Sequence, residues 1–231
     1  MSLKLDREDL LGSVIALRLV ELEGGPEAVG DVREGLERLV GRTVSRAIAA
    51  RVLGISQTAL DRHARSGSLA VVETPAGRRE VPLGELVSLA VELRRHLHAR
   101  HPLAAVLDDR RARAKRLTAA RLLPESGKAA GGHRQAELRA LVFHRAIAWQ
   151  LDGQLVTDAK RRLRRWHADR LIDPRLQESW ATLLDQPLEE IRRTIKSDDQ
   201  AAADLRQSSP FAGSLSEPER RRIVEIVREA A

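Results

Sequence analysis

The sequence predicts a mainly α-helical protein with one small β-hairpin near its middle and a separate all-helical region at its C-terminal end. Three observations lead to this fold class. Apolar residues recur at helical spacing through most of the chain, one short segment is rich in valine on either side of a turn, and residues 124–132 have the composition of a linker. The 231 residues are enough for two small domains.

The part before the linker is expected to contain helices on both sides of the hairpin. Gly24, Gly25 and Pro26 interrupt the first helical pattern, and Gly54 interrupts a later one. Pro102 ends a further helix, because proline cannot continue the hydrogen-bond ladder. We predict helices at about 5–23 and 26–40, two short helices within 44–66, a hairpin over 69–81, a helix from 82 to about 100 and a basic helix from 102 to about 123.

The part after the linker reads as helical throughout. We predict helices at about 133–151, 157–170, 174–185, 187–196, 199–207 and 217–230. Ser216 and Glu219 form a capping box that opens the last of them. The chain is therefore divided into N-terminal helices that pack on a head (1–43), the head (44–100), a basic helix with a glycine-rich linker (101–132) and an all-helical partner or dimerisation domain (133–231).

Residues 45–65 carry the most informative pattern in the chain. Two helices that cross closely need a small residue at their contact, and Ala50 occupies that position. The sharp turn between them needs a residue with positive φ, which Gly54 supplies. Ser56 is suited to cap the second helix, and Leu60 faces the core. This pattern predicts a helix-turn-helix.

The surrounding residues extend the pattern. They are Ala49-Ala50-Arg51-Val52-Leu53-Gly54-Ile55-Ser56, then Ser66-Gly67-Ser68-Leu69, then Gly77-Arg78-Arg79 and Val81-Pro82-Leu83. Residues 44–92 thus resemble the winged helix-turn-helix head of the excisionase and MerR-like families, which implies binding to double-stranded DNA. His63 departs from the family, which usually buries an apolar residue there. Either His63 is partly exposed or the packing around it differs.

If the head binds DNA, the helix at 57–66 enters the major groove. Gln57 then pairs with adenine, and Arg62 or Arg65 with guanine. Asp61 either accepts from cytosine or pairs with Arg65 four residues later, and we favour the pair. Basic side chains at the hairpin tip contact phosphates or the minor groove, and those before the first helix contact the DNA backbone. The candidate DNA-binding residues are Arg42, Ser45, Arg46, Ser56, Gln57, Thr58, Asp61, Arg62, Arg65, Arg78 and Arg79.

The charge distribution agrees with this location. The chain has a net charge of +7, and residues 41–100 contribute +5 of it. The basic run 110–116 either lies along phosphates or forms a solvated helix face. The run 160–165 leaves the same two alternatives open, because Val156, Ala159, Leu163 and Trp166 form an apolar stripe beside it and nearby aspartates offer partners.

Several functional classes are excluded or disfavoured. The absence of cysteine excludes disulfides and thiolate metal sites, and five aromatic residues are too few for base-stacking RNA modules. Three of the five are tryptophans, which we expect in the core, and Phe211 is expected to anchor its loop on its own domain. No P-loop, HExxH or GxSxG motif occurs, so we expect no enzyme, cofactor or metal site. No apolar run spans a membrane, and we expect a cytoplasmic protein without a membrane partner.

The sequence therefore leads to a functional hypothesis with two alternatives. We expect a sequence-specific regulator of transcription, a repressor, that binds double-stranded DNA as a homodimer. The first alternative is an antitoxin that represses its own operon with the head and binds a partner toxin through residues 133–231. The second is a recombination or nucleoid accessory protein.

Overall fold

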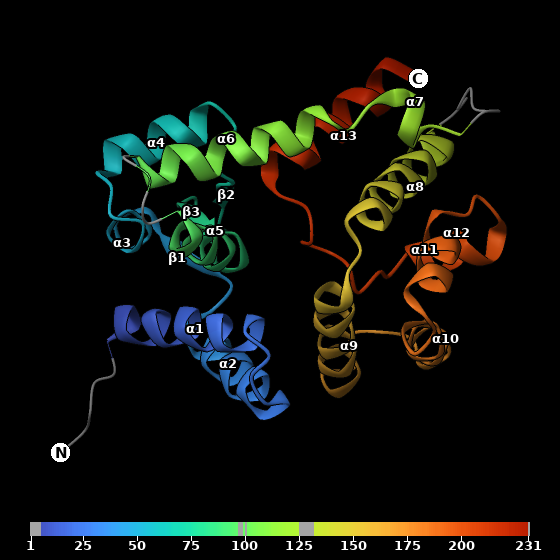
Figure 1. Cartoon of the computed structure of the whole chain (residues 1–231), viewed down its shortest axis with the longest axis horizontal. Helices are drawn as coiled ribbons and strands as arrows, with labels where there is room; N and C mark the ends of the chain where they lie inside the picture. Colours follow the sequence, from blue (N-terminus) through green and yellow to red (C-terminus); the bar gives the residue numbers. More distant parts are fainter. Residues whose placement is uncertain (1–5, 97–98, 100, 125–131, 231) are drawn as a thin grey trace. The chain divides into compact units, whose positions relative to one another are not determined.

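The computed structural model describes residues 6–96, 99, 101–124 and 132–230. It is mainly helical with a small three-stranded antiparallel sheet (Figure 1). The chain divides into two compact units, Met1–Ala112 (the N-terminal unit) and Arg113–Ala231 (the C-terminal unit). Residues 125–131 of the predicted linker lie outside the described residues. None of the described helices is long and apolar enough to cross a membrane.

The N-terminal unit begins with two helices, α1 (Arg7–Leu22) and α2 (Glu27–Val40), as the sequence predicts. Gly24 between them has a φ of 86°. Gly25 is required for a different reason, because a Cβ atom there would lie 2.7 Å from the carbonyl oxygen of Val20. The two helices are joined by a buried ion pair in which Arg33 Nε lies 2.9 Å from Glu21 Oε2. The predicted break is therefore confirmed.

The following part of the N-terminal unit, residues 43–95, forms three helices and three short strands. These are β1 (Thr43–Ser45), α3 (Arg46–Val52), α4 (Gln57–Arg65), β2 (Val72–Glu73), β3 (Arg79–Pro82) and α5 (Leu83–Arg95). The predicted hairpin is confirmed as β2 and β3, although its paired residues are fewer than predicted. The sheet order is β1-β3-β2, with Val44 opposite Val81. The sequence analysis assigns no strand to β1, because three residues are too few to show the alternation that identifies a strand.

The core of the N-terminal unit consists of leucine, valine, isoleucine and alanine. Leu11 and Val14 of α1, Leu60 of α4, and Leu86 and Leu89 of α5 are each fully buried in it. These residues recur at helical spacing, which is why their helices are predictable from the sequence. This core fixes α4 against α3 and α5 and leaves the other face of α4 to solvent.

The helix that follows, α6 (Pro102–Lys115), contains the basic run predicted at 110–116. Arg110 is 1% exposed, so it neither lies along phosphates nor belongs to a solvated helix face, the two alternatives for this run. Its guanidinium lies 2.8 Å from Glu85 and 2.6 Å from Glu92 of α5, and it also donates to Ser88. Arg110 therefore joins α6 to α5 and is not available to a ligand. The predicted helix to residue 123 is also wrong in extent, because α6 ends at Lys115 and a short α7 (Ala119–Leu122) follows.

The C-terminal unit contains the six helices predicted after the linker. They are α8 (Gly132–Gln150), α9 (Gly153–Ala168), α10 (Pro174–Leu184), α11 (Leu188–Lys196), α12 (Gln200–Arg206) and α13 (Glu217–Ala230). Their core contains Trp180, which is fully buried and meets Phe211 edge to face at 5.8 Å between ring centroids. The expectation that Phe211 anchors its loop is confirmed. The capping box is also present, since Ser216 N donates to Glu219 Oε2 at 2.8 Å.

The basic run 160–165 lies on α9, and Val156, Ala159 and Leu163 of its apolar stripe are buried as predicted. Trp166, the fourth residue of the stripe, is only half-buried, so the prediction that it is a core residue is wrong. Both alternatives for the basic run, phosphate binding and a solvated face, require exposed cations, and neither holds for Arg161, which is 5% exposed. Lys160 Nζ lies 2.6 Å from Asp185 of α10, and Arg162 donates to the carbonyl oxygen of Pro210. Much of this run is therefore engaged within the unit.

Candidate nucleic-acid interface

The turn between α3 and α4 is set by backbone conformation and by capping. Gly54 has a φ of 66°, and no atom lies within 4 Å of the position that a Cβ would take, so conformation and not space requires glycine. Ile55 N donates to Ala50 O at 3.0 Å and Gly54 N to Arg51 O at 3.1 Å, which closes α3 with a Schellman motif. Ala50 is buried at the start of this turn, and Leu53 and Ile55 on either side of Gly54 pack into the core.

The second helix begins at its predicted cap. Ser56 Oγ accepts from Ala59 N at 3.2 Å, and in the same way Ser45 Oγ caps α3 by accepting from Ile48 N. Both hydroxyl groups were predicted to contact DNA. In the structure each hydroxyl caps its helix, and this contact uses one of its two acceptor lone pairs.

The predicted contact residues of α4 share one face. Successive residues of a helix are rotated by about 100°, so the five positions 57, 58, 61, 62 and 65 fall within about 140° of arc. Leu60 and Ala64 lie outside this arc and are buried. Gln57, Thr58, Arg62 and Arg65 are exposed. The helix therefore presents two amide or hydroxyl groups near its N-terminus and two guanidinium groups farther along.

The expected pair between Asp61 and Arg65 is not formed by the two side chains. Asp61 Oδ1 lies 2.7 Å from Arg46 NH1 of α3, whereas Arg65 Nε donates at 3.4 Å to the backbone carbonyl of Asp61. Both members of the Arg46–Asp61 pair are about one-third exposed. The reach of Arg46 across the turn explains the difference, since α3 and α4 pack closely there. The only carboxylate on the exposed face of α4 within the described structure is thus neutralised from α3.

The hairpin places two further predicted residues in solvent. Arg78 and Arg79 are exposed at the turn that leads into β3. The turn is closed by Thr74, whose N donates to Arg78 O at 2.8 Å, and by Gly77, which has a φ of 69°. The register sets Arg79 opposite Glu73, so part of its charge is balanced across the strands. Arg42, before β1, is also exposed.

His63 lies behind the exposed face of α4 and is half-buried. It lines a small internal space with leucines of the N-terminal core. Burial, helped by the positive charges of Arg62 and Arg111, lowers the pKa of His63. Of the two alternatives for this residue, the partly exposed helix residue is the one observed.

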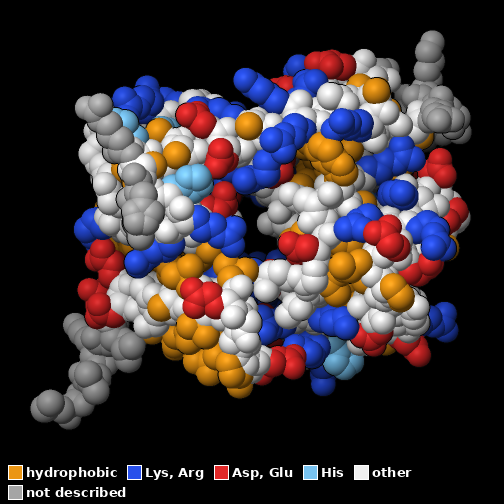
Figure 2. Space-filling model, viewed as in Figure 1, with side chains coloured by type: hydrophobic (Ala, Val, Ile, Leu, Met, Phe, Trp, Pro, Cys, Tyr) orange, Lys and Arg blue, Asp and Glu red, His pale blue; other side chains and the backbone are white. Residues whose placement is uncertain are grey.

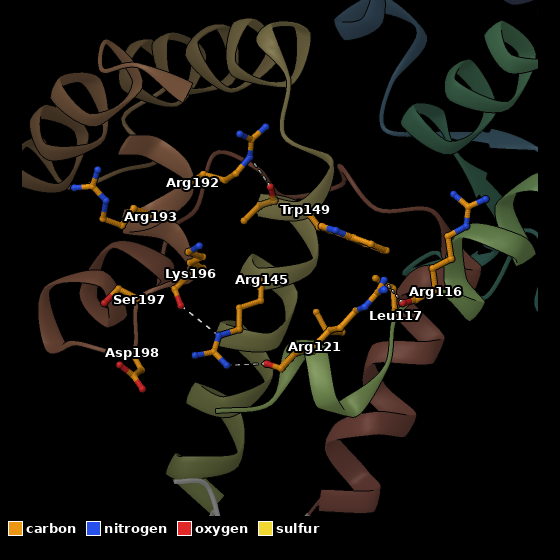
Figure 3. Close-up of a pocket in the computed structure, with 12 residues that line it drawn as sticks. Arg116, Leu117, Arg121, Arg145, Trp149, Arg192, Arg193, Lys196, Ser197 and Asp198 are labelled. Atoms are coloured by element: carbon orange, nitrogen blue, oxygen red, sulfur yellow. Dashed lines mark hydrogen bonds between the residues drawn. The ribbon is translucent and has the colours of Figure 1, made fainter. Parts of the chain in front are cut away.

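The C-terminal unit contains a cleft that the sequence analysis does not identify. It has a volume of about 760 Å³ and lies among the segment leading into α7, the C-terminal half of α8, and the end of α11 (Figure 3). Trp149 stands at this cleft and is 52% exposed, which contradicts the prediction that all three tryptophans are core residues. The three residues before it, 146–148, are all buried, and no pattern in the sequence distinguishes Trp149 from them.

The described residues contain no group of three or more His, Asp or Glu side chains that could hold a metal ion. Comparison of the chain with protein-family models, with curated proteins and with solved structures finds no match to any of them.

Proposed function

We propose that this protein is a sequence-specific regulator of transcription that binds double-stranded DNA by inserting α4 into the major groove. The observation that carries the proposal is the exposed face of α4. It combines Gln57 and Thr58 at the N-terminal end with Arg62 and Arg65, and it sits on a helix that α3 and α5 hold rigidly. Major-groove reading uses these donor and acceptor types on the exposed face of one helix.

The surroundings of α4 support the same role. Arg42 and Arg78 are exposed cations without a carboxylate partner among the described residues. In the proposed complex they contact phosphates on either side of the groove, as a hairpin wing and a loop before the first helix do. Such contacts position the protein and make affinity depend on salt, without selecting a sequence.

The Arg46–Asp61 pair gives the proposal a specific test. An unpaired carboxylate on α4 would repel phosphates, so Arg46 acts by holding Asp61 neutral as well as by adding charge. We expect Arg46→Ala to weaken DNA binding and Asp61→Asn to restore most of the loss in that background. If Arg46 contacts a phosphate directly and Asp61 is irrelevant, the second substitution will restore nothing.

The main experiment starts with selection of a binding site from random duplexes by the full chain, followed by anisotropy titrations on the selected site. The test variant is Arg62→Ala/Arg65→Ala, and the matched control is Arg94→Ala/Arg95→Ala, which removes two exposed arginines from α5 of the same unit. Each base contact discriminates by about 1–3 kcal/mol, so the test variant should lose at least about tenfold in preference for the selected site.

The control variant should keep both its preference for the selected site and the salt dependence of binding, because its two arginines make no contact in the proposed complex. Circular dichroism of both variants establishes that they are folded. Recovery of no preferred site, or equal preference in both variants, contradicts the assignment of α4.

A second copy of the chain is part of the proposal, because one helix reads too few base pairs to define an operator. Hydrophobic side chains gather over α1 and α2 (Figure 2), where Val32 and Leu39 of α2 are 56% and 71% exposed. These two residues lie seven apart and so on one helix face. Leu39→Glu should convert a dimer into a monomer by light scattering. A parent chain that is already monomeric when bound to DNA would exclude this surface.

A further inference from the structure

Half of the residues that line the cleft of the C-terminal unit are cations. Those among the described lining residues are Arg116, Arg121, Arg145, Arg192, Arg193 and Lys196, and the one carboxylate is Asp198. The two arginines at 192 and 193 pair with glutamates of α11. The other four cations have no carboxylate partner within the described structure. Among the described residues, the cations of the cleft therefore outnumber its carboxylate and the two glutamates paired with them.

Two of these arginines build the wall of the cleft. Arg145 donates to Leu122 O at 3.1 Å and to Lys196 O at 3.3 Å, so it ties α8 to both neighbouring segments. Arg192 Nε donates to Ala148 O at 3.0 Å. Figure 3 shows Arg145 between its two carbonyl partners. The segments that form the walls of the cleft are thus joined to one another by hydrogen bonds.

Trp149 adds an aromatic surface to this cationic cleft. The guanidinium carbon of Arg121 lies 4.7 Å from the indole centroid, which is a cation–π contact (Figure 3). Half of the side chain is nevertheless exposed, at the edge of a cleft whose volume lies in the range of small-molecule sites. An exposed indole beside arginines is suited to stacking a flat ring.

The geometry points to a binding site for a phosphorylated nucleoside in this cleft. The cations supply fork-like donors for phosphate oxygens, and the indole supplies a face for the base. Inorganic phosphate alone would leave the indole unused, and a neutral nucleoside would leave the cations unused. A nucleotide satisfies both, and the cleft volume is enough for one. This inference does not depend on the proposed role of α4.

The test uses the full chain and calorimetric titration with the four ribonucleoside monophosphates, adenosine and inorganic phosphate. At least one monophosphate should bind with a dissociation constant below about 1 mM, and at least about tenfold more tightly than adenosine or phosphate. All three tryptophans belong to the C-terminal unit, so quenching of tryptophan fluorescence gives an independent reading.

Two variants separate the base and phosphate contributions. Trp149→Phe should lower the affinity for the monophosphate about tenfold. The matched control is Trp166→Phe, which changes a half-buried tryptophan of α9 and should leave this affinity unchanged. Arg121→Ala/Lys196→Ala should remove the advantage of the monophosphate over its nucleoside. Its control is Arg175→Ala/Arg228→Ala, which removes two exposed arginines away from the cleft.

Three results would overturn the inference. The first is the absence of binding by any monophosphate, and the second is equal affinity in the test and control variants. The third concerns the source of the nucleotide. A single-stranded decanucleotide that binds through Trp149 over a hundred times more tightly than every monophosphate would identify a strand-binding surface instead of a nucleotide site.

Discussion

His144 makes the stability of the C-terminal unit depend on pH. The ring lies in α8 and is 5% exposed. Its Nδ1 lies 2.7 Å from Ala140 O, a carbonyl that can only accept, so the neutral ring carries its proton on Nδ1. Its Nε2 is buried and has no hydrogen-bond partner among the described residues. A second proton would therefore place a buried charge without an acceptor.

The size of the effect follows from the pKa of this ring. Burial lowers the pKa of His144 from 6.5 to about 4, against the opposing hydrogen bond to Ala140 O, and the positive charge of Arg206 lowers it further. Between these two values the unfolded chain binds a proton that the folded chain does not, so stability rises with pH. At one pKa unit per 1.36 kcal/mol, the full loss is about 3 kcal/mol, and about 2 kcal/mol is lost between pH 7.5 and pH 5.

The assay is urea unfolding of the full chain at these two pH values, followed by tryptophan fluorescence, which reports on the C-terminal unit alone. His144→Leu removes the titrating group, so the difference in unfolding free energy between the two pH values should shrink by about 2 kcal/mol. The exposed His167 of α9 offers the matched control, His167→Leu. An unchanged pH dependence in His144→Leu would refute the reasoning.

Three further predictions concern the N-terminal unit and are read by amide hydrogen exchange of its peptides. Arg110→Met leaves two carboxylates of α5 without their buried partner and should cost about 3–5 kcal/mol. Arg95→Met, at an exposed position of α5, should leave the free energy of unfolding almost unchanged. Equal losses in Arg110→Met and Arg95→Met would contradict a stabilising role of the buried Arg110 network. Leu60→Ala removes a fully buried side chain and should cost about 2–5 kcal/mol; a smaller loss would mean that α4 is not anchored there. Gly54→Ala forces a β-carbon into positive φ and should cost about 1–2 kcal/mol, and a neutral result would contradict the turn conformation.

The helices and the turn are predictable because their causes are local. Gly54 and Ser56 act on backbone within a few residues, and the buried leucines of α4 and α5 recur with the helical period. The same holds for the six helices of the C-terminal unit, each of which begins or ends at a recognisable residue. Local signals of this kind are read from a single sequence.

The features that the sequence analysis misses depend on residues far apart in the chain. β1 exists because Val44 meets Val81, and Arg110 is buried because α5 supplies its carboxylates. Asp61 pairs with Arg46 and not with its helical neighbour, because the packing of α3 on α4 brings the two together. The cleft combines segments from residues 116 to 198, so no local pattern indicates it.

The aliphatic core of the N-terminal unit has a practical consequence. Residues 1–112 contain no Trp, Tyr or Phe, so this half of the chain neither absorbs nor emits in the near ultraviolet. A fluorescent base analogue in bound DNA could be followed there without interference, while the indole signal comes wholly from the other half. The base analogue and the intrinsic tryptophan emission therefore give two signals that can be recorded separately in the unmodified protein. Since only the C-terminal unit contains tryptophan, a change of indole emission on addition of DNA would report on that unit without an introduced label.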